Sequence, residues 1–222
     1  MISALLGFAA GSLHVLTGPD HLAAVSPLAI ENKDNASIVG FKWGLGHTGG
    51  VCLLGFLALV LREIMPLNFI SGYSERIIGI ILIGIGLWGI KKAYFNKIHV
   101  HYHEHDGHRH IHFHSHGKET SPESPNTHSH THTAFAVGIM HGFAGTSHIF
   151  GILPALAFTS RIDAVFYLLS FGVGTVAAMT IFASIIGYIS KKLEVKGTLI
   201  IQRMLASFST AAIFIGFYWI LF

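Results

Sequence analysis

Two histidines, an aspartate and a Gly-Pro pair interrupt a stretch of sequence that is otherwise apolar. The stretch reads HVLTGPDHLAAVSPLA and covers residues 14–29. Ionisable side chains and a proline are costly within a membrane-spanning helix, so a functional use is the first interpretation of each. Two imidazoles and a carboxylate form a ligand set that suits a borderline divalent ion such as nickel, cobalt or zinc. The chemistry that this segment indicates is therefore metal binding.

The Gly18-Pro19 pair decides whether these side chains can meet. On an unbroken helix, His14 and His21 would lie about 10 Å apart along the axis. One ion with bonds of about 2 Å cannot span that distance. Proline removes a backbone N–H and clashes with the preceding turn, and glycine accepts unusual backbone angles. A break at this pair is therefore predicted, and it brings His14 towards Asp20 and His21.

A structural interpretation of the same residues stays open. Thr17 or Gly18 would cap a second half-helix that begins at Pro19, and Asp20 would stabilise its N-terminus. The histidines would then form hydrogen bonds to neighbouring helices. Substitution separates the two interpretations, because asparagine caps a helix about as well as aspartate but lacks its charge.

Three histidines elsewhere in apolar segments are further candidates. His47 lies in KWGLGHTGG, whose glycines allow another backbone to approach closely, and we expect it to be a ligand or to line the ion pathway. The alternative is that these glycines only pack helices and a carbonyl satisfies His47. His141 and His148 would complete the site or line its exit, and Gly145 is the break expected between them.

The composition is that of a membrane protein. Of the 222 residues, 51% are hydrophobic and 11% are charged, whereas soluble domains carry about 25% charged residues. The single cysteine, Cys52, cannot form an intramolecular disulfide, which argues against a thiol-relay protein.

Six segments are long enough to cross about 30 Å of hydrocarbon, so an all-α polytopic fold is predicted. They lie near residues 3–30, 37–61, 72–95, 134–159, 162–190 and 198–221. The first and the fourth are interrupted. We expect a first three-helix unit over 1–95, a disordered loop over 96–133 and a second three-helix unit over 134–222.

The two units resemble each other in sequence. FAAGSLHVLTGPDHLAAVSPLA from Phe8 matches FAVGIMHGFAGTSHIFGILPAL from Phe135, a shift of 127 residues. Further on, WGLGHTGG from Trp43 resembles FGVGTVAA from Phe171, a shift of 128 residues. Because each unit has an odd number of spans, the two must have opposite topology. Inverted repeats with broken helices are the layout of many secondary transporters.

Lysine and arginine predict the orientation of the chain. The connections after spans one, three and five are rich in them, and those after spans two and four are poor. The positive-inside rule then places the loop over 96–133 in the cytoplasm and both termini outside, in a cell membrane.

The loop over 96–133 has an unusual histidine content. It contains HVHYHEHDGHRHIHFHSH and twelve histidines in all, which we expect to act as a metal buffer. The alternative is a solvated linker. The twelve are His99, His101, His103, His105, His108, His110, His112, His114, His116, His128, His130 and His132.

At these residues the chain resembles the nickel/cobalt transporter (NiCoT) superfamily, including its UreH-like and RcnA-like membrane proteins. The family signature is a histidine, four residues, then Asp-His in a broken helix; His14, Asp20 and His21 match it with five intervening residues. The stretch around His47 looks like the second histidine motif of the family. The resemblance implies transport of nickel or cobalt; UreH-like members are associated with nickel supply to urease, and RcnA-like exporters also carry a histidine-rich loop.

The sequence therefore predicts a secondary transporter of a divalent transition-metal cation. The expected ligands are His14, Asp20, His21 and His47, the expected cargo is nickel or cobalt with zinc as a further candidate, and no enzyme activity or nucleic-acid partner is expected. A homo-oligomer is compatible with the sequence. The alternatives are an intramembrane zinc enzyme, a bis-histidine haem protein, and an exporter of another metal or of an anion such as sulfite. The chain contains no P-loop for ATP.

Overall fold

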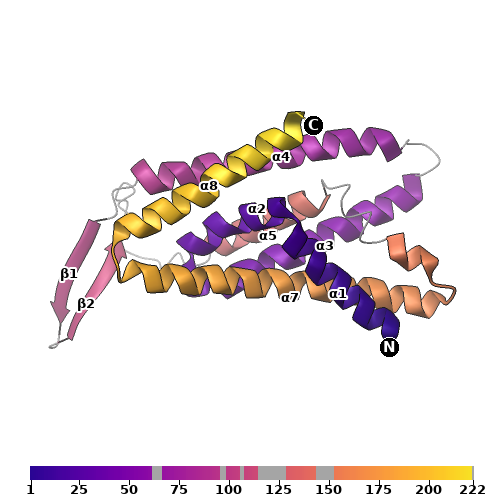
Figure 1. Ribbon diagram of the computed structural model, residues 1–222, viewed down its shortest axis with the longest axis horizontal. Helices are drawn as coiled ribbons and strands as arrows, with labels where there is room; N and C mark the ends of the chain where they lie inside the picture. Colours follow the sequence, from indigo (N-terminus) through magenta and orange to yellow (C-terminus); the bar gives the residue numbers. More distant parts are fainter. Residues whose placement is uncertain (62–66, 96–98, 106–107, 115–128, 144–152, 222) are drawn as a thin grey trace.

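The structure is a computed structural model that describes residues 1–61, 67–95, 99–105, 108–114, 129–143 and 153–221. Long helices dominate it, as predicted, and a small two-stranded sheet extends from one end of the bundle (Figure 1). The elements are α1 (Ile2–Thr17), α2 (Pro19–Glu31), the 3₁₀ helix η1 (Lys33–Asn35), α3 (Ala36–Leu61), α4 (Leu67–Phe95), β1 (His99–His105), β2 (His108–His114), α5 (Ser129–Phe143), η2 (Leu153–Ala157), α7 (Arg161–Glu194) and α8 (Thr198–Leu221).

Three helical segments are long and apolar enough to cross a membrane within the described part of the chain, namely Glu75–Tyr94, Arg161–Glu194 and Thr198–Leu221. The pair α1 and α2, bent by 74°, makes a fourth if it is one broken span. Large apolar side chains cover the outside of these helices: Ile2, Leu169 and Phe214 are 74%, 64% and 71% exposed. An exposed apolar surface of this extent is typical of a protein that contacts lipid. The chain is thus a multi-pass membrane protein, and the count of six spans stays a prediction.

The break between α1 and α2 lies where the sequence predicts it. Gly18 ends α1 and precedes α2, and Pro19 is the first residue of α2. A side chain on Gly18 would overlap the imidazole of His21, so the break needs glycine for space as well as for flexibility. The second predicted interruption, near Gly145, lies outside the described residues.

Glycines bring the helices into backbone contact in all three main helix pairs, α1–α7, α3–α5 and α4–α8. In α1, a methyl group on Gly11 would overlap the carbonyl oxygen of Phe171. In α5, a methyl group on Gly138 would overlap the carbonyl oxygen of Trp43. Small residues at such crossings let dispersion forces hold helices together in lipid, where the hydrophobic effect contributes little.

These contacts correspond under the sequence repeat. Gly11 and Gly138 are aligned positions in the two units, and so are Trp43 and Phe171. A second set behaves alike: Gly174 abuts the carbonyl oxygen of Phe8 and Gly46 abuts that of Phe135, and both residue pairs are again related by shifts of 128 and 127. These two contacts of α1 with α7 therefore have counterparts between α5 and α3.

The histidine-rich loop differs from the disorder predicted for residues 96–133. Its strands β1 and β2 pair antiparallel, and α5 begins within the segment, at Ser129. The prediction weighed polar composition and overlooked alternation, because apolar and aromatic residues that favour strands separate the histidines. The register contains four His–His pairs, His99 with His114, His101 with His112, His103 with His110 and His105 with His108.

Ion pairs gather where this hairpin joins the bundle. Glu31 at the end of α2 pairs with Lys92 of α4. Nζ of Lys33 lies 2.5 Å from Oε1 of Glu194 at the end of α7. Oδ1 of Asp34 lies 3.1 Å from Nζ of Lys191. The connections that the sequence predicts to share one side of the membrane therefore do lie together in space (Figure 1).

Adjacent glycines of α3 allow a matched test of the helix contacts. A methyl group on Gly50 would overlap the carbonyl oxygen of Ile139 in α5, whereas one on Gly49 meets nothing within 4 Å. We expect Gly50→Ala to destabilise the purified protein by about 1–3 kcal/mol through overpacking, and Gly49→Ala to be neutral or slightly stabilising. Thermal denaturation in detergent measures both, and equal melting temperatures would contradict the packing described for α3 and α5.

The strand register sharpens the prediction that the loop binds metal. His101 and His112 belong to one cross-strand pair, whereas His101 and His110 belong to two. Directly opposed residues lie closest together, so a pair is the smallest unit that can chelate an ion. The His101/His110 double alanine variant should thus lose about twice as many loop-bound nickel ions as the His101/His112 variant. Equilibrium dialysis of the full chain counts them, and an equal loss would indicate an unstructured buffer.

Candidate metal site at the helix break

Five ionisable side chains from four helices converge beside the break between α1 and α2. His14 comes from α1, Asp20 and His21 from α2, His47 from α3 and His141 from α5. Asp20 is 3% exposed, His21 and His47 are each 1% exposed, and His141 is fully buried. His14 alone is partly exposed. Their donor atoms form two groups of three, each within 4.8 Å: His14, His21 and His47, and Asp20, His21 and His141.

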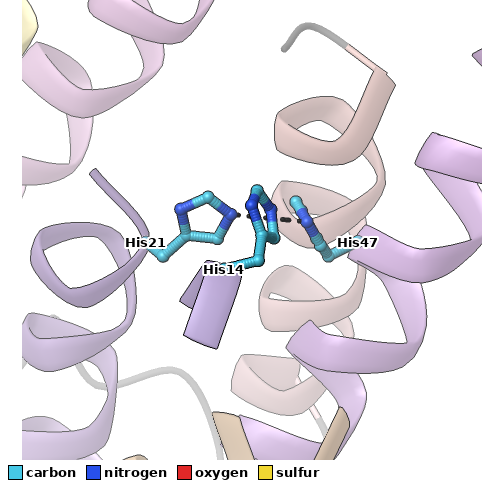
Figure 2. Close-up of side chains that lie close together, drawn as sticks. All are labelled: His14, His21 and His47. Atoms are coloured by element: carbon cyan, nitrogen blue, oxygen red, sulfur yellow. Dashed lines mark hydrogen bonds between the residues drawn. The ribbon is translucent and has the colours of Figure 1, made fainter. Parts of the chain in front are cut away.

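The break supplies the proximity that the sequence argument required. The ring centroids of His14 and His21 lie 4.7 Å apart, less than half the separation of about 10 Å that a straight helix would impose. The ring of His47 lies 4.8 Å from that of His21 and 5.9 Å from that of His14. Figure 2 shows the three rings side by side, each carried by a different helix.

Asp20 contacts two histidines. Its Oδ1 lies 3.0 Å from Nδ1 of His21, and its Oδ2 lies 3.1 Å from Nε2 of His141. An ionised carboxylate only accepts hydrogen bonds, so each imidazole donates through the nitrogen that faces it. In a neutral ring the other nitrogen then carries a lone pair. Asp20 therefore fixes the tautomer of His21 with its lone pair on Nε2.

That lone pair points towards a second imidazole. Nε2 of His21 and Nε2 of His47 lie 3.4 Å apart (Figure 2, dashed line). Two nitrogens bound at about 2.0–2.1 Å to one tetrahedral ion are separated by about 3.3–3.4 Å. The spacing is therefore the one that two ligands of a single transition-metal ion adopt, and the ring of His14 adjoins both.

The site is lined by two aromatic side chains that the sequence argument did not assign to it. The fully buried Trp43 stacks on His47 at a centroid distance of 5.1 Å, and it also contacts His21 and His141. Phe171 packs against His14 at 5.7 Å. The repeat contained the signal, because Trp43 and Phe171 are aligned residues that each lie beside a site histidine.

Other predicted site residues lie elsewhere. His148, His116 and His128 fall outside the described residues. The histidines of β1 and β2 lie at the end of the bundle, away from the break (Figure 1), and His130 and His132 belong to the start of α5. Of the predicted residues that the structure describes, it thus brings together His14, Asp20, His21, His47 and His141.

Three similar proteins and one family place the chain among known proteins. Two from Arabidopsis thaliana, Chloroplast protein FOR GROWTH AND FERTILITY 1 and 2, are 36% and 35% identical over 217 residues, which is 97% of this chain and 58% and 55% of theirs. The chain spans less than two thirds of their length. Urease accessory protein UreH from Bacillus sp. (strain TB-90) is 30% identical over 190 residues, 82% of this chain and 75% of that protein.

The match to UreH agrees with the UreH-like part of the sequence resemblance, while the family match does not single out the nickel/cobalt superfamily. No solved structure matches the chain significantly. Residues 4–218 match the family described as the cytochrome c biogenesis protein transmembrane region, nearly the whole chain. The chain is therefore a multi-pass membrane protein of the cytochrome c biogenesis protein transmembrane region family.

Proposed function

We propose that the chain is a secondary transporter of a divalent transition-metal cation, with nickel or cobalt as its first candidates. The facing Nε2 atoms of His21 and His47, 3.4 Å apart beside His14, carry this proposal. Three imidazoles are a ligand set for nickel, cobalt, zinc or copper and a poor one for magnesium or calcium. Such a set buried between broken and glycine-packed helices indicates an ion that crosses the membrane.

Asp20 serves this site by orienting His21. A metal-bound histidine usually donates its other ring N–H to a carboxylate, which fixes the ring and raises its basicity. The contact of Asp20 with Nδ1 of His21 is of that kind. Its negative charge also offsets part of the charge of an arriving dication in a site with little access to water. Asp20 is then a positioning residue when the ion lies on Nε2 of His21.

The sequence repeat supports a transporter whose binding site lies at the interface of its two halves. Equivalent glycine contacts in α1–α7 and α5–α3 are the packing expected of two halves with opposite topology, built around a site at their interface. The break at Gly18 provides the discontinuous helix that such transporters use. We place the lysine-rich end, with its hairpin, in the cytoplasm. The similarity to UreH, which is named a urease accessory protein, is compatible with this proposal.

The first prediction of this proposal concerns metal flux. His21→Ala and His14→Ala should each lower nickel or cobalt flux by at least about tenfold, because each removes a ligand. Deletion of residues 99–127 should leave flux in place, since the hairpin lies outside the bundle (Figure 1). Proteoliposomes of known orientation, tested with nickel, cobalt, zinc and manganese, provide the measurement. Ser207→Ala on the exposed side of α8 controls for insertion, and near-normal flux in either histidine variant would refute the proposed site.

The second prediction concerns Asp20. Asp20→Asn keeps one carbonyl acceptor but removes the charge and leaves two imidazole donors to share it. Metal affinity should fall about 10–100-fold, while thermal stability without metal stays unchanged or rises. Isothermal titration and melting curves measure the two effects. Asp163→Asn, which alters a carboxylate bound to Ser3 far from the site, is the matched control; unchanged affinity in Asp20→Asn would reduce Asp20 to a structural residue.

A further inference from the structure

We propose that the site holds one ion in two successive positions, one on each ring nitrogen of His21. The outer position is formed by His14, His47 and Nε2 of His21. The inner position is formed by Asp20, His141 and Nδ1 of His21. This inference rests on the proposed transport of a metal ion and describes its path past His21.

The two ligand groups share His21 and use its opposite sides. Towards the outer group, Nε2 lies 3.4 Å from Nε2 of His47. Towards the inner group, Nδ1 lies 3.0 Å from Asp20, whose second oxygen lies 3.1 Å from Nε2 of His141. Adjacent ligands of one ion with bonds of about 2.0–2.1 Å are separated by about 3.0–3.4 Å, depending on geometry. The two contacts of Asp20 in the inner group therefore have the spacing that adjacent ligands of one ion adopt.

Burial and charge give the two positions an order. The outer group includes the partly exposed His14, whereas all three inner residues are buried. The outer group consists of neutral imidazoles, and the inner group adds a carboxylate. An ion that moves inward thus exchanges contact with water for a negative charge, which is the compensation that a buried dication needs. His141 comes from α5, so the inner position joins the second half of the chain to the first.

The proton of His21 prevents both positions from being filled at once. With the ion on Nε2, the ring keeps its proton on Nδ1 and donates it to Asp20. With the ion on Nδ1, the proton lies on Nε2, facing His47. His141 likewise shifts its proton from Nε2 to Nδ1 when it binds the ion. Every imidazole stays neutral and no proton leaves the site, so the wild-type site binds one ion.

Two single substitutions separate the positions. His47→Ala should move the ion to the inner group, and His141→Ala should confine it to the outer group. Each purified variant also carries the 99–127 deletion, which removes loop binding, and should bind one nickel ion. X-ray absorption should report a carboxylate among the ligands of His47→Ala and imidazoles alone in His141→Ala. Flux should fall at least about tenfold in both, because each variant lacks one step of the path.

Two conservative variants distinguish a ligand from a structural residue at position 141. His141→Gln keeps an N–H donor for Asp20 but is a poor ligand for nickel, whereas His141→Cys keeps a metal donor. Partial recovery of flux with cysteine but not with glutamine is expected. Recovery with glutamine would show that His141 only bonds to Asp20 and would overturn the inner position.

The binding measurements test the two ion positions independently of transport. Two ions per wild-type site, identical ligands in His47→Ala and His141→Ala, or loss of binding in both would overturn the two positions, whether or not the protein transports metal. One ion per wild-type site, with the expected ligands in His47→Ala and in His141→Ala but no transport of any tested metal by the wild-type protein, would instead contradict the proposed function alone.

Discussion

Pro19 has no amide proton to give to α1, and Gly18 has no side chain to occupy the space beside His21. These two absences end α1 just after His14 and start α2 at a bend of 74°. The turn that would have separated His14 from His21 is thereby removed, and their rings come within 4.7 Å. The other contacts of the site depend on this bend, because His47 and His141 both pack against the ring of His21, which the bend positions.

The rest of the bundle holds those partners in position through backbone contact. In lipid, helices gain little from burying apolar surface against one another, so close approach must supply the attraction. Glycines on α1, α3, α5 and α7 allow it. Because Trp43 and His47 lie one turn apart on α3, the contact of Gly138 with the carbonyl oxygen of Trp43 also fixes the helix that carries His47. Packing and site geometry are therefore determined by the same few crossings.

Much of this site could be predicted from the sequence because its signals are local. A proline after a glycine in an apolar segment predicts a break, and the ionisable residues around it are expensive enough to indicate use. Trp43 was not assigned, since an aromatic residue on an apolar helix is ordinarily only packing; only its alignment with Phe171 pointed to the site. The part played by Asp20 depends on which imidazole nitrogen faces each of its oxygens, and spacing does not encode that.

The hairpin was missed for a different reason. Counting polar residues predicts disorder, but alternation with Val100, Tyr102, Ile111 and Phe113 favours strands. Local sequence signals do not determine the number of membrane spans either. That number depends on how the apolar segments are arranged, and some of them lie partly outside the described residues.

The paired glycine contacts affect how fast the two units of the chain diverge in sequence. A lipid-facing leucine can be replaced by isoleucine or phenylalanine with little loss of stability. Sequence similarity between the two units is therefore lost quickly at lipid-facing positions. Gly11 and Gly138, or Gly46 and Gly174, tolerate no side chain against a facing carbonyl oxygen. Mutation is therefore filtered twice at the same structural position, once in each half. The sequence resemblance between the two units should therefore persist longest at these crossings, where both pairs of glycines are aligned.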